Sequence, residues 1–207
     1  MSAELARYEQ KSVELQKLID SKQLPSHIKT PETAYLIDKM GRELGFPTIQ
    51  AMHYIIPIQG RLTLSAKAIG AILRKNGVTM QTLEDAFWVY PNGDVKEVHS
   101  GEVNPIDRRT TIVFKRNGIE EKVSYNQTDA QAAGLTTKDN WKRMYKEMAW
   151  ARCLSKGANR IGQDLLLGMY GADEMFDSLD TTGIQVKRDD DGYIKEVIDE
   201  SEYETVE

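Results

Sequence analysis

The chain has 207 residues, of which 40% are hydrophobic and 29% are charged, and this is enough apolar material for the core of one domain. Its single cysteine, Cys153, excludes an intrachain disulfide and a cysteine-rich metal site, and it favours a reducing, intracellular compartment. No apolar run approaches the ~18 residues of a membrane span, and the N-terminus lacks the apolar stretch of a signal peptide.

The net charge of −5 is unevenly distributed along the chain. Residues 1–172 hold 24 basic and 19 acidic residues, whereas residues 173–207 hold 3 basic and 13 acidic ones. The first part is therefore a mildly basic body with a net charge of +5, and the second is an acidic tail with −10. A basic body is compatible with nucleic acid, although many protein surfaces are mildly basic.

The N-terminal third predicts helices and a hairpin. Apolar residues recur near helical spacing over residues 3–21, which predicts an amphipathic helix that packs in the core or between subunits. A second helix is predicted over 30–44, because its first residues, Thr-Pro-Glu, suit a helix cap and first turn. β-branched and aromatic residues on both sides of Gln59-Gly60 predict paired strands, and a helix is predicted over 65–76.

The rest of the chain predicts a meander and two further helices. Residues 78–125 are typical of antiparallel strands, with one turn at 91–94 and another at Asn117-Gly118, where both positions tolerate a positive φ. A short helix is predicted over 128–134, and a long helix over 137–161.

These elements predict an α+β fold, with a small antiparallel β-sheet of hairpins and a meander packed against helices. The long basic helix follows the sheet toward the C-terminus. We expect three segments, which are an N-terminal helix and subunit contact over 1–30, a core over 31–176 and an acidic flexible tail over 177–207. The tail is predicted to be disordered because it is acidic and poor in apolar residues.

Positive charge is concentrated on the predicted helix 137–161. Between Lys138 and Arg160 there are seven basic and two acidic residues. Arg152, Lys156 and Arg160 are spaced by four residues, so they lie one above another on a helix and repel each other. An anion along this stripe would relieve the repulsion, and a phosphate backbone is the commonest extended anion. A solvated outer face is the alternative interpretation.

The candidate DNA contacts are of two kinds, namely basic side chains that would neutralise phosphates and aromatic side chains that would stack on bases. The basic candidates are Arg61, Lys67, Arg74, Arg108, Arg109, Lys138, Lys142, Lys146, Arg152, Lys156 and Arg160. The aromatic candidates are Trp141 and Tyr145, and Trp150 is expected in the core. Together these residues are expected to line one groove.

Enzymatic signatures are scarce. No GxxxxGK[ST], GxGxxG or GxSxG pattern is present, and the three histidines lack metal-ligand spacing. Cys153 is expected to be a buried structural residue. One loose pattern resembles a metal nuclease, in which Asp107 and Glu120 would hold magnesium and Lys122 would assist a water.

Three segments resemble the phage single-strand annealing proteins of the RecT and Red-beta kind. They are the strand, turn and LSA-helix segment over 55–77, DAQAAGL over 129–135, and NWKRMYKEMAWARCLSKGANRI over 140–161. The family's W, M, R, S and R pattern falls on Trp141, Met148, Arg152, Ser155 and Arg160, and the likeness continues through Asp164, Gly168, Tyr170, Asp173 and Glu174. It covers about residues 31–176. In many relatives a proline precedes the methionine of this helix, whereas here Glu147 precedes Met148. Many relatives also carry a folded C-terminal domain, and this sequence has an acidic tail in its place.

The resemblance implies a DNA-binding protein rather than an enzyme. Such proteins have a small β-sheet packed on helices, coat single-stranded DNA as rings or helical filaments, and pair complementary strands without ATP. The DNA backbone would be neutralised by Lys142, Arg152, Lys156 and Arg160. The resemblance implies no cofactor, and it does not require magnesium.

The implied partners are single-stranded DNA, annealed duplex and further copies of the chain, with a host single-strand-binding protein or a phage exonuclease as additional partners. The implied location is the cytoplasm of a bacterium that carries phage, away from the membrane. Two alternatives stay open, which are the metal-dependent nuclease and a passive coating protein that binds single strands but slows their pairing. The acidic tail either competes with DNA, recruits a partner or keeps the protein soluble.

Overall fold

The computed structural model of the chain describes residues 3–99, 101, 103–178, 184–188 and 194–199. The helices are α1 (Ala3–Asp20), α2 (Pro31–Glu43), α3 (Thr48–Tyr54), α4 (Ala66–Lys75), α5 (Gln127–Ala132), α6 (Asp139–Arg143), α7 (Tyr145–Ile161) and α8 (Ala172–Ser178), with short 3-10 helices η1 (Leu135–Thr137) and η2 (Gln163–Leu166). The strands are β1 (Ile55–Ile58), β2 (Arg61–Leu64), β3 (Thr79–Val89), β4 (Val95–Lys96), β5 (Asp107–Arg116), β6 (Ile119–Asn126), β7 (Ile184–Arg188) and β8 (Ile194–Asp199). The predicted α+β class is confirmed.

The central sheet is antiparallel, with the strand order β4-β3-β5-β6. β5 and β6 pair in uninterrupted register around the turn Asn117-Gly118, whose residues have φ of 50° and 81°. A two-residue turn with positive φ at both positions matches the twist of the strands, as predicted. β3 shifts its register against β5 on either side of Glu84, so this pair is bent.

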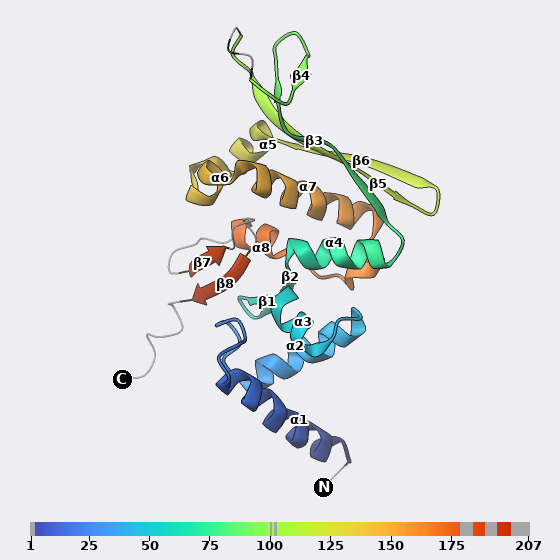
Figure 1. The fold of residues 1–207 in the computed structure, drawn as a ribbon, viewed down its shortest axis with the longest axis vertical. Coiled ribbons are helices and arrows are strands. Elements are labelled where there is room, and N and C mark those ends of the chain that lie inside the picture. The colour runs from blue at the N-terminus through green and yellow to red at the C-terminus, as the bar shows by residue number, and fades with distance from the viewer. Residues whose placement is uncertain (1–2, 100, 102, 179–183, 189–193, 200–207) are drawn as a thin grey trace.

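Figure 1 shows how the elements are layered: the sheet covers one side of α7, and α4 lies along the other side. The β1–β2 hairpin follows below α4, and α3, α2 and α1 continue to the end of the molecule opposite the sheet. Because α7 is covered on two sides, most of its length is buried. Its buried residues are Met148, Ala149, Ala151, Cys153, Leu154, Ser155, Gly157, Ala158 and Ile161.

Two hydrophobic clusters hold the layers together. The main cluster extends from Leu15 on α1 through the helices to Phe114 on β5. A smaller cluster joins β1 to α8 through Ile56, Ile58 and Phe176. The second cluster fixes α8 beside the hairpin, and this placement matters for the site described below.

Helix boundaries agree with the sequence where local signals are strong. The Thr30 side chain accepts a hydrogen bond from Thr33 N at the start of α2, and Ser65 caps α4 in the same way. α5 begins with a capping box in which Asn126 and Asp129 bond each other's backbone.

The long helix predicted over 137–161 is wrong, because the chain forms α6 and α7 with a break at Met144. This residue has φ −130° and ψ 44°, outside helical geometry, and its amide donates to Asn140 O. α3 was also missed, since no helix was predicted between the one over 30–44 and the paired strands on either side of Gln59-Gly60. Pro47 precedes α3 in extended geometry, which suits a helix start.

Within the segment predicted as a disordered tail, the structure places β7 and β8 as an antiparallel pair. Residues 179–183, 189–193 and 200–207, on which much of this prediction falls, lie outside the described residues.

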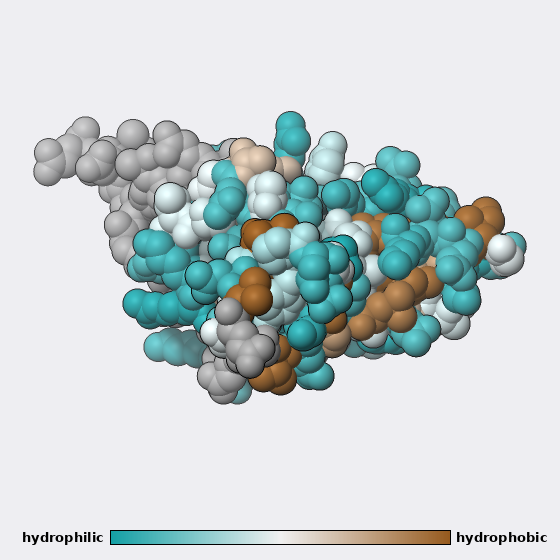
Figure 2. Space-filling view, turned by 90° about the horizontal axis from the view of Figure 1, so that it is seen from above, coloured by the Kyte–Doolittle hydropathy of each residue, from teal (hydrophilic) through white to brown (hydrophobic). Residues whose placement is uncertain are grey.

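In the described part of the chain, no helix combines the length and the apolarity that crossing a membrane requires. Seen from above, the surface is mostly hydrophilic, with hydrophobic residues in separate patches (Figure 2). Exposed apolar side chains occur in the segment between β4 and β5, at Val98, Val103 and Ile106.

Candidate nucleic-acid interface

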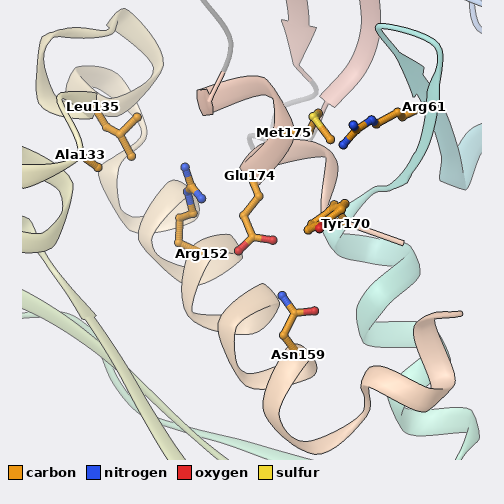
Figure 3. Close-up of a pocket in the computed structure, with 8 residues that line it drawn as sticks. All are labelled: Arg61, Ala133, Leu135, Arg152, Asn159, Tyr170, Glu174 and Met175. Atoms are coloured by element: carbon orange, nitrogen blue, oxygen red, sulfur yellow. The ribbon is translucent and has the colours of Figure 1, made fainter. Parts of the chain in front are cut away.

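An open hollow of about 500 Å³ lies beside α7. It is lined by Arg61, Ala133, Leu135, Arg152, Asn159, Tyr170, Glu174 and Met175 (Figure 3). These residues come from the start of β2, the segment from the end of α5 to the first residue of η1, α7, and the chain that leads into and forms α8. Tertiary packing rather than closeness in the sequence therefore assembles the hollow.

Two predicted phosphate-binding residues meet at this hollow. Arg61 is exposed at the hairpin, and Arg152 is half-buried on α7. Figure 3 shows them on opposite sides of the hollow. Two guanidinium groups lining one concave surface suit an anionic group, because charge-assisted hydrogen bonds to phosphate are among the strongest available to a protein.

A carboxyl group shares the hollow with these arginines. Glu174 projects from α8 between Arg152 and Tyr170 (Figure 3). Burial raises the pKa of the Glu174 carboxyl, and the nearby charge of Arg152 partly opposes this rise. Its Oε2 atom is buried and, among the described residues, accepts no hydrogen bond. An ionised Glu174 would weaken the binding of an anion here.

Lys156 and Arg160 continue from Arg152 along α7 but turn toward β6. The Nζ atom of Lys156 is 6.0 Å from the ring centroid of Tyr125, and Nη1 of Arg160 is 3.9 Å from Oε2 of Glu121. Residues four apart on a helix drift by about 40° per step, so the predicted stripe curves around α7. Lys156 and Arg160 are therefore not part of the hollow's lining.

Arg109 and Lys146 are engaged in ion pairs with β3. Nε and Nη2 of Arg109 donate to the two carboxylate oxygens of Glu84 at 2.6 and 2.7 Å, and these hydrogen bonds lower the pKa of Glu84. Nζ of Lys146 is 2.9 Å from Oδ2 of Asp85. Both pairs join the bent strand to its neighbours, so strand packing already explains these two residues.

Arg108 is held between two aromatic rings. Its guanidinium carbon lies 4.5 Å from the ring centroid of Trp88 and 4.7 Å from that of Tyr145. The Tyr145 hydroxyl also donates to Arg108 O at 2.9 Å. Burial raises the pKa of Tyr145. One face of the Tyr145 ring is thus occupied by Arg108, which leaves less of the ring for a base.

The prediction that Trp141 stacks on bases is corrected by its burial. Trp141 is only 2% exposed, and its ring packs against Tyr125 and Tyr145 at centroid distances of 5.9 and 6.0 Å. A base has no access to a ring in this position. Trp150 packs against the main core as predicted, although only partly buried, and its Nε1 donates to Thr82 Oγ1 at 3.2 Å.

The remaining basic candidates do not line the hollow either. Lys67 and Arg74 are exposed on α4, Lys142 is exposed on α6, and Lys138 precedes α6. Of the basic candidates, only Arg61 and Arg152 line the described hollow, so this hollow is not the single groove expected for all of them.

The nuclease pattern is not assembled by the fold. Asp107 accepts hydrogen bonds from Gln127 N and Thr128 Oγ1, at 2.9 and 2.7 Å, and so holds the start of α5. Glu120 pairs with Lys115 at 2.7 Å near the opposite end of β5, roughly 26 Å away along the strand. Among the described residues, no group of three or more carboxylate, histidine or cysteine side chains is placed to hold a metal ion.

Cys153 is a buried structural residue, as predicted. It is 0% exposed, and its thiol donates to Val123 O at 3.1 Å. Burial raises the pKa of the thiol to about 11, so the nucleophilic thiolate is scarce at neutral pH.

A second hollow, of about 290 Å³, lies between α1 and α2 and is lined by Arg7, Tyr8, Lys11, Tyr35, Asp38, Lys39 and Arg42. Two of its basic residues approach the buried carboxylate of Asp38, Arg42 at 3.1 Å and Lys11 at 3.9 Å. Thr48 Oγ1 also donates to Asp38 at 2.5 Å. Arg42 and Lys11 therefore already have an internal anionic partner.

Sequence reasoning gave Tyr170 no role beyond the resemblance. The structure places it at the edge of the first hollow, where it is 54% exposed. A lone tyrosine in a short loop carries no periodic signal, so only the folded arrangement draws attention to it.

Scans of the chain against protein-family models, curated proteins and solved structures found no match. The interpretation of the hollow therefore depends on its own residues and on the sequence resemblance.

Proposed function

We propose that the chain is an ATP-independent protein that binds single-stranded DNA and anneals complementary strands. In this proposal it acts as an oligomer in the cytoplasm of a bacterium that carries phage, with the DNA backbone at the hollow beside α7. Single-stranded DNA and the annealed duplex are its ligands.

One observation carries the proposal: every segment on which the resemblance to the RecT and Red-beta proteins depends contributes to the lining of one hollow. Segment 55–77 contributes Arg61, segment 129–135 contributes Ala133 and Leu135, and segment 140–161 contributes Arg152 and Asn159. The continuation of the resemblance contributes Tyr170 and Glu174. Segments that share a likeness to one family and converge on one surface favour a common binding role for that surface.

Physical chemistry explains how such a protein speeds annealing. Two strands repel through their phosphates, and base pairing returns about 1.4 kcal/mol per step only after the register is found. Arginines that neutralise phosphates lower the repulsion, and a strand held in place loses less entropy when it pairs. No covalent bond changes, so the proposal needs no catalytic residue.

The first test mixes two complementary oligonucleotides, one fluorescent and one quenched, with EDTA and without ATP. We expect pairing well above the protein-free rate, with an acceleration that falls steeply as salt rises. A passive coating protein would bind the strands and slow their pairing, which contradicts the annealing proposal. Cleavage of a labelled strand after addition of magnesium would favour a nuclease instead.

The second test removes the two arginines of the hollow. Arg61→Gln with Arg152→Gln should weaken DNA binding. The slope of log K against log salt should also become less negative, by about 0.7 for each phosphate that the protein no longer neutralises. A control removes the same charge from exposed positions outside the hollow, by Lys17→Gln and Lys22→Asn. Asparagine suits position 22 because its φ is 56°.

The control variant should keep the wild-type urea-unfolding midpoint, since its replaced side chains are exposed and lie outside the core cluster. The arginine variant should unfold cooperatively at a somewhat lower urea concentration, because Arg152 favours the ionised form of the buried Glu174 carboxyl. Equal loss of DNA binding in the control and in the arginine variant would show that net charge, and not the hollow, binds DNA.

A further inference from the structure

We propose that Tyr170 is the base-stacking residue of this protein, a role that rests on the proposed binding of single-stranded DNA. A stacking residue must present an accessible ring, beside phosphate-binding groups, on backbone that does not move when a base arrives. Tyr170 meets these three requirements.

Accessibility separates Tyr170 from the two aromatic residues that the sequence favoured. Tyr170 is 54% exposed, whereas Trp141 is 2% exposed and Tyr145 is stacked on Arg108. An exposed aromatic residue is ordinary by itself, because much of any protein surface is apolar. The position of Tyr170 is what gives its exposure meaning.

Tyr170 lies on the same side of the hollow as Arg61 and opposite Arg152 (Figure 3). A nucleotide has its phosphate and its base on opposite sides of the sugar. A ring that lines the same hollow as two guanidinium groups therefore matches a strand whose backbone contacts the arginines while one base lies on the tyrosine. Because every base has a π-face, this contact does not select a sequence, and annealing of any sequence requires that tolerance.

The backbone of Tyr170 is fixed by two neighbouring elements. Leu64 N of β2 donates to Tyr170 O at 2.9 Å, and Leu64 forms a parallel bridge with Gly171. Gly171 packs so closely against α7 that an added Cβ would lie 2.6 Å from Oγ of Ser155. The residues on both sides, Met169 and Gly171, are buried, so the ring projects from an ordered support.

The test compares two fluorescein-labelled strands of equal length and charge, one of thymidines and one with abasic sites. Wild-type protein should bind the thymidine strand more tightly. Tyr170→Leu should weaken binding to that strand by about tenfold per stacked base and leave binding to the abasic strand unchanged. Tyr170→Phe, which keeps the ring, should bind like wild type. The salt slope should be equal in all three proteins, because no phosphate contact changes.

The outcomes separate this inference from the proposed function. If wild type binds neither strand, the proposed function fails and the role of Tyr170 fails with it. If wild type binds thymidines and Tyr170→Leu binds them equally well, only the stacking role is overturned. Equal weakening on both strands, or a change in the mass of the free protein in sedimentation, would assign Tyr170 to a subunit contact instead.

Discussion

At the level of single residues, Glu174 is the acidic group that lines the hollow together with Arg61 and Arg152. Its carboxyl group lies among Arg152, Asn159 and Asp173, of which Arg152 favours the ionised form and Asp173 opposes it. Burial is the largest influence, and it raises the pKa of Glu174. The folded protein therefore binds the Glu174 proton more tightly than the unfolded chain does.

This shift predicts a pH dependence of stability. Below the unfolded-state pKa, Glu174 is protonated in both states and has no effect on stability; as pH rises through the folded-state pKa, the buried charge lowers the free energy of unfolding. Glu174→Gln should therefore unfold at higher urea than wild type near pH 7, and the difference should vanish near about pH 4. A variant less stable than wild type at neutral pH would mean that the carboxylate gains more from Arg152 than it loses by burial.

The same substitution should strengthen DNA binding at neutral pH, because a neutral side chain no longer repels phosphate in the hollow. Wild-type affinity should rise as pH falls through the pKa of Glu174, and the affinity of Glu174→Gln should change less over that interval. Fluorescence anisotropy with a labelled thymidine strand measures both proteins.

At the level of elements, α7 is the helix around which the sheet, α4 and α8 are arranged. Its close contact with the sheet depends on Gly157, where an added Cβ would overlap the ring of Phe114 on β5. Gly70 on α4 is different, because an added Cβ there would lie 3.6 Å from Nη1 of Arg74 and 4.0 Å from Cδ2 of Leu154. Position 157 therefore has no room for a Cβ atom, whereas position 70 has room for one.

Gly157→Ala should lower the free energy of unfolding by about 1–3 kcal/mol, because the Phe114 ring or the helix must shift. Gly70→Ala should raise it by about 0.5–1 kcal/mol, since alanine costs less backbone entropy in a helix and finds ordinary contacts. Urea titration of both variants measures the difference. Equal effects of the two substitutions would contradict the close packing of α7 on β5.

At the level of the whole molecule, positive and negative charge are separated along the chain. Residues 1–172 carry a net charge of +5, and residues 173–207 carry −10. Acidic residues of a protein compete with an anionic ligand for its basic residues, over distances of about 10 Å at 0.1 M salt. If the chain binds DNA as proposed, we expect the acidic segment to lower the attraction of the basic body for it.

Replacing Asp189, Asp190 and Asp191 by asparagine removes three negative charges without shortening the chain. We expect severalfold tighter binding of single-stranded DNA near about 0.05 M salt and little difference near about 0.5 M, where charges are screened. An affinity gain that persists at high salt would indicate a direct contact of this segment with the DNA-binding surface.

Local signals allowed correct predictions where a feature depends on a few neighbouring residues. Asn117-Gly118 forms the β5–β6 turn because both residues accept positive φ, and Thr30 caps α2 because its hydroxyl meets a free helical amide. The break at Met144 was missed because no glycine or proline marks it.

The sequence by itself determined the α+β class, the main turns and the separation of charge, because these follow from composition, periodicity and the φ preferences of single residues. Only the tertiary structure decided which side chains reach solvent together. The sequence favoured Trp141 as a stacking residue and gave Tyr170 no such role, yet packing buries the first and exposes the second. Likewise Arg61 and Arg152 line one hollow because the contact of α8 with β1 brings the hairpin close to α7. Burial is a property of the assembled layers, and so no local pattern determines it.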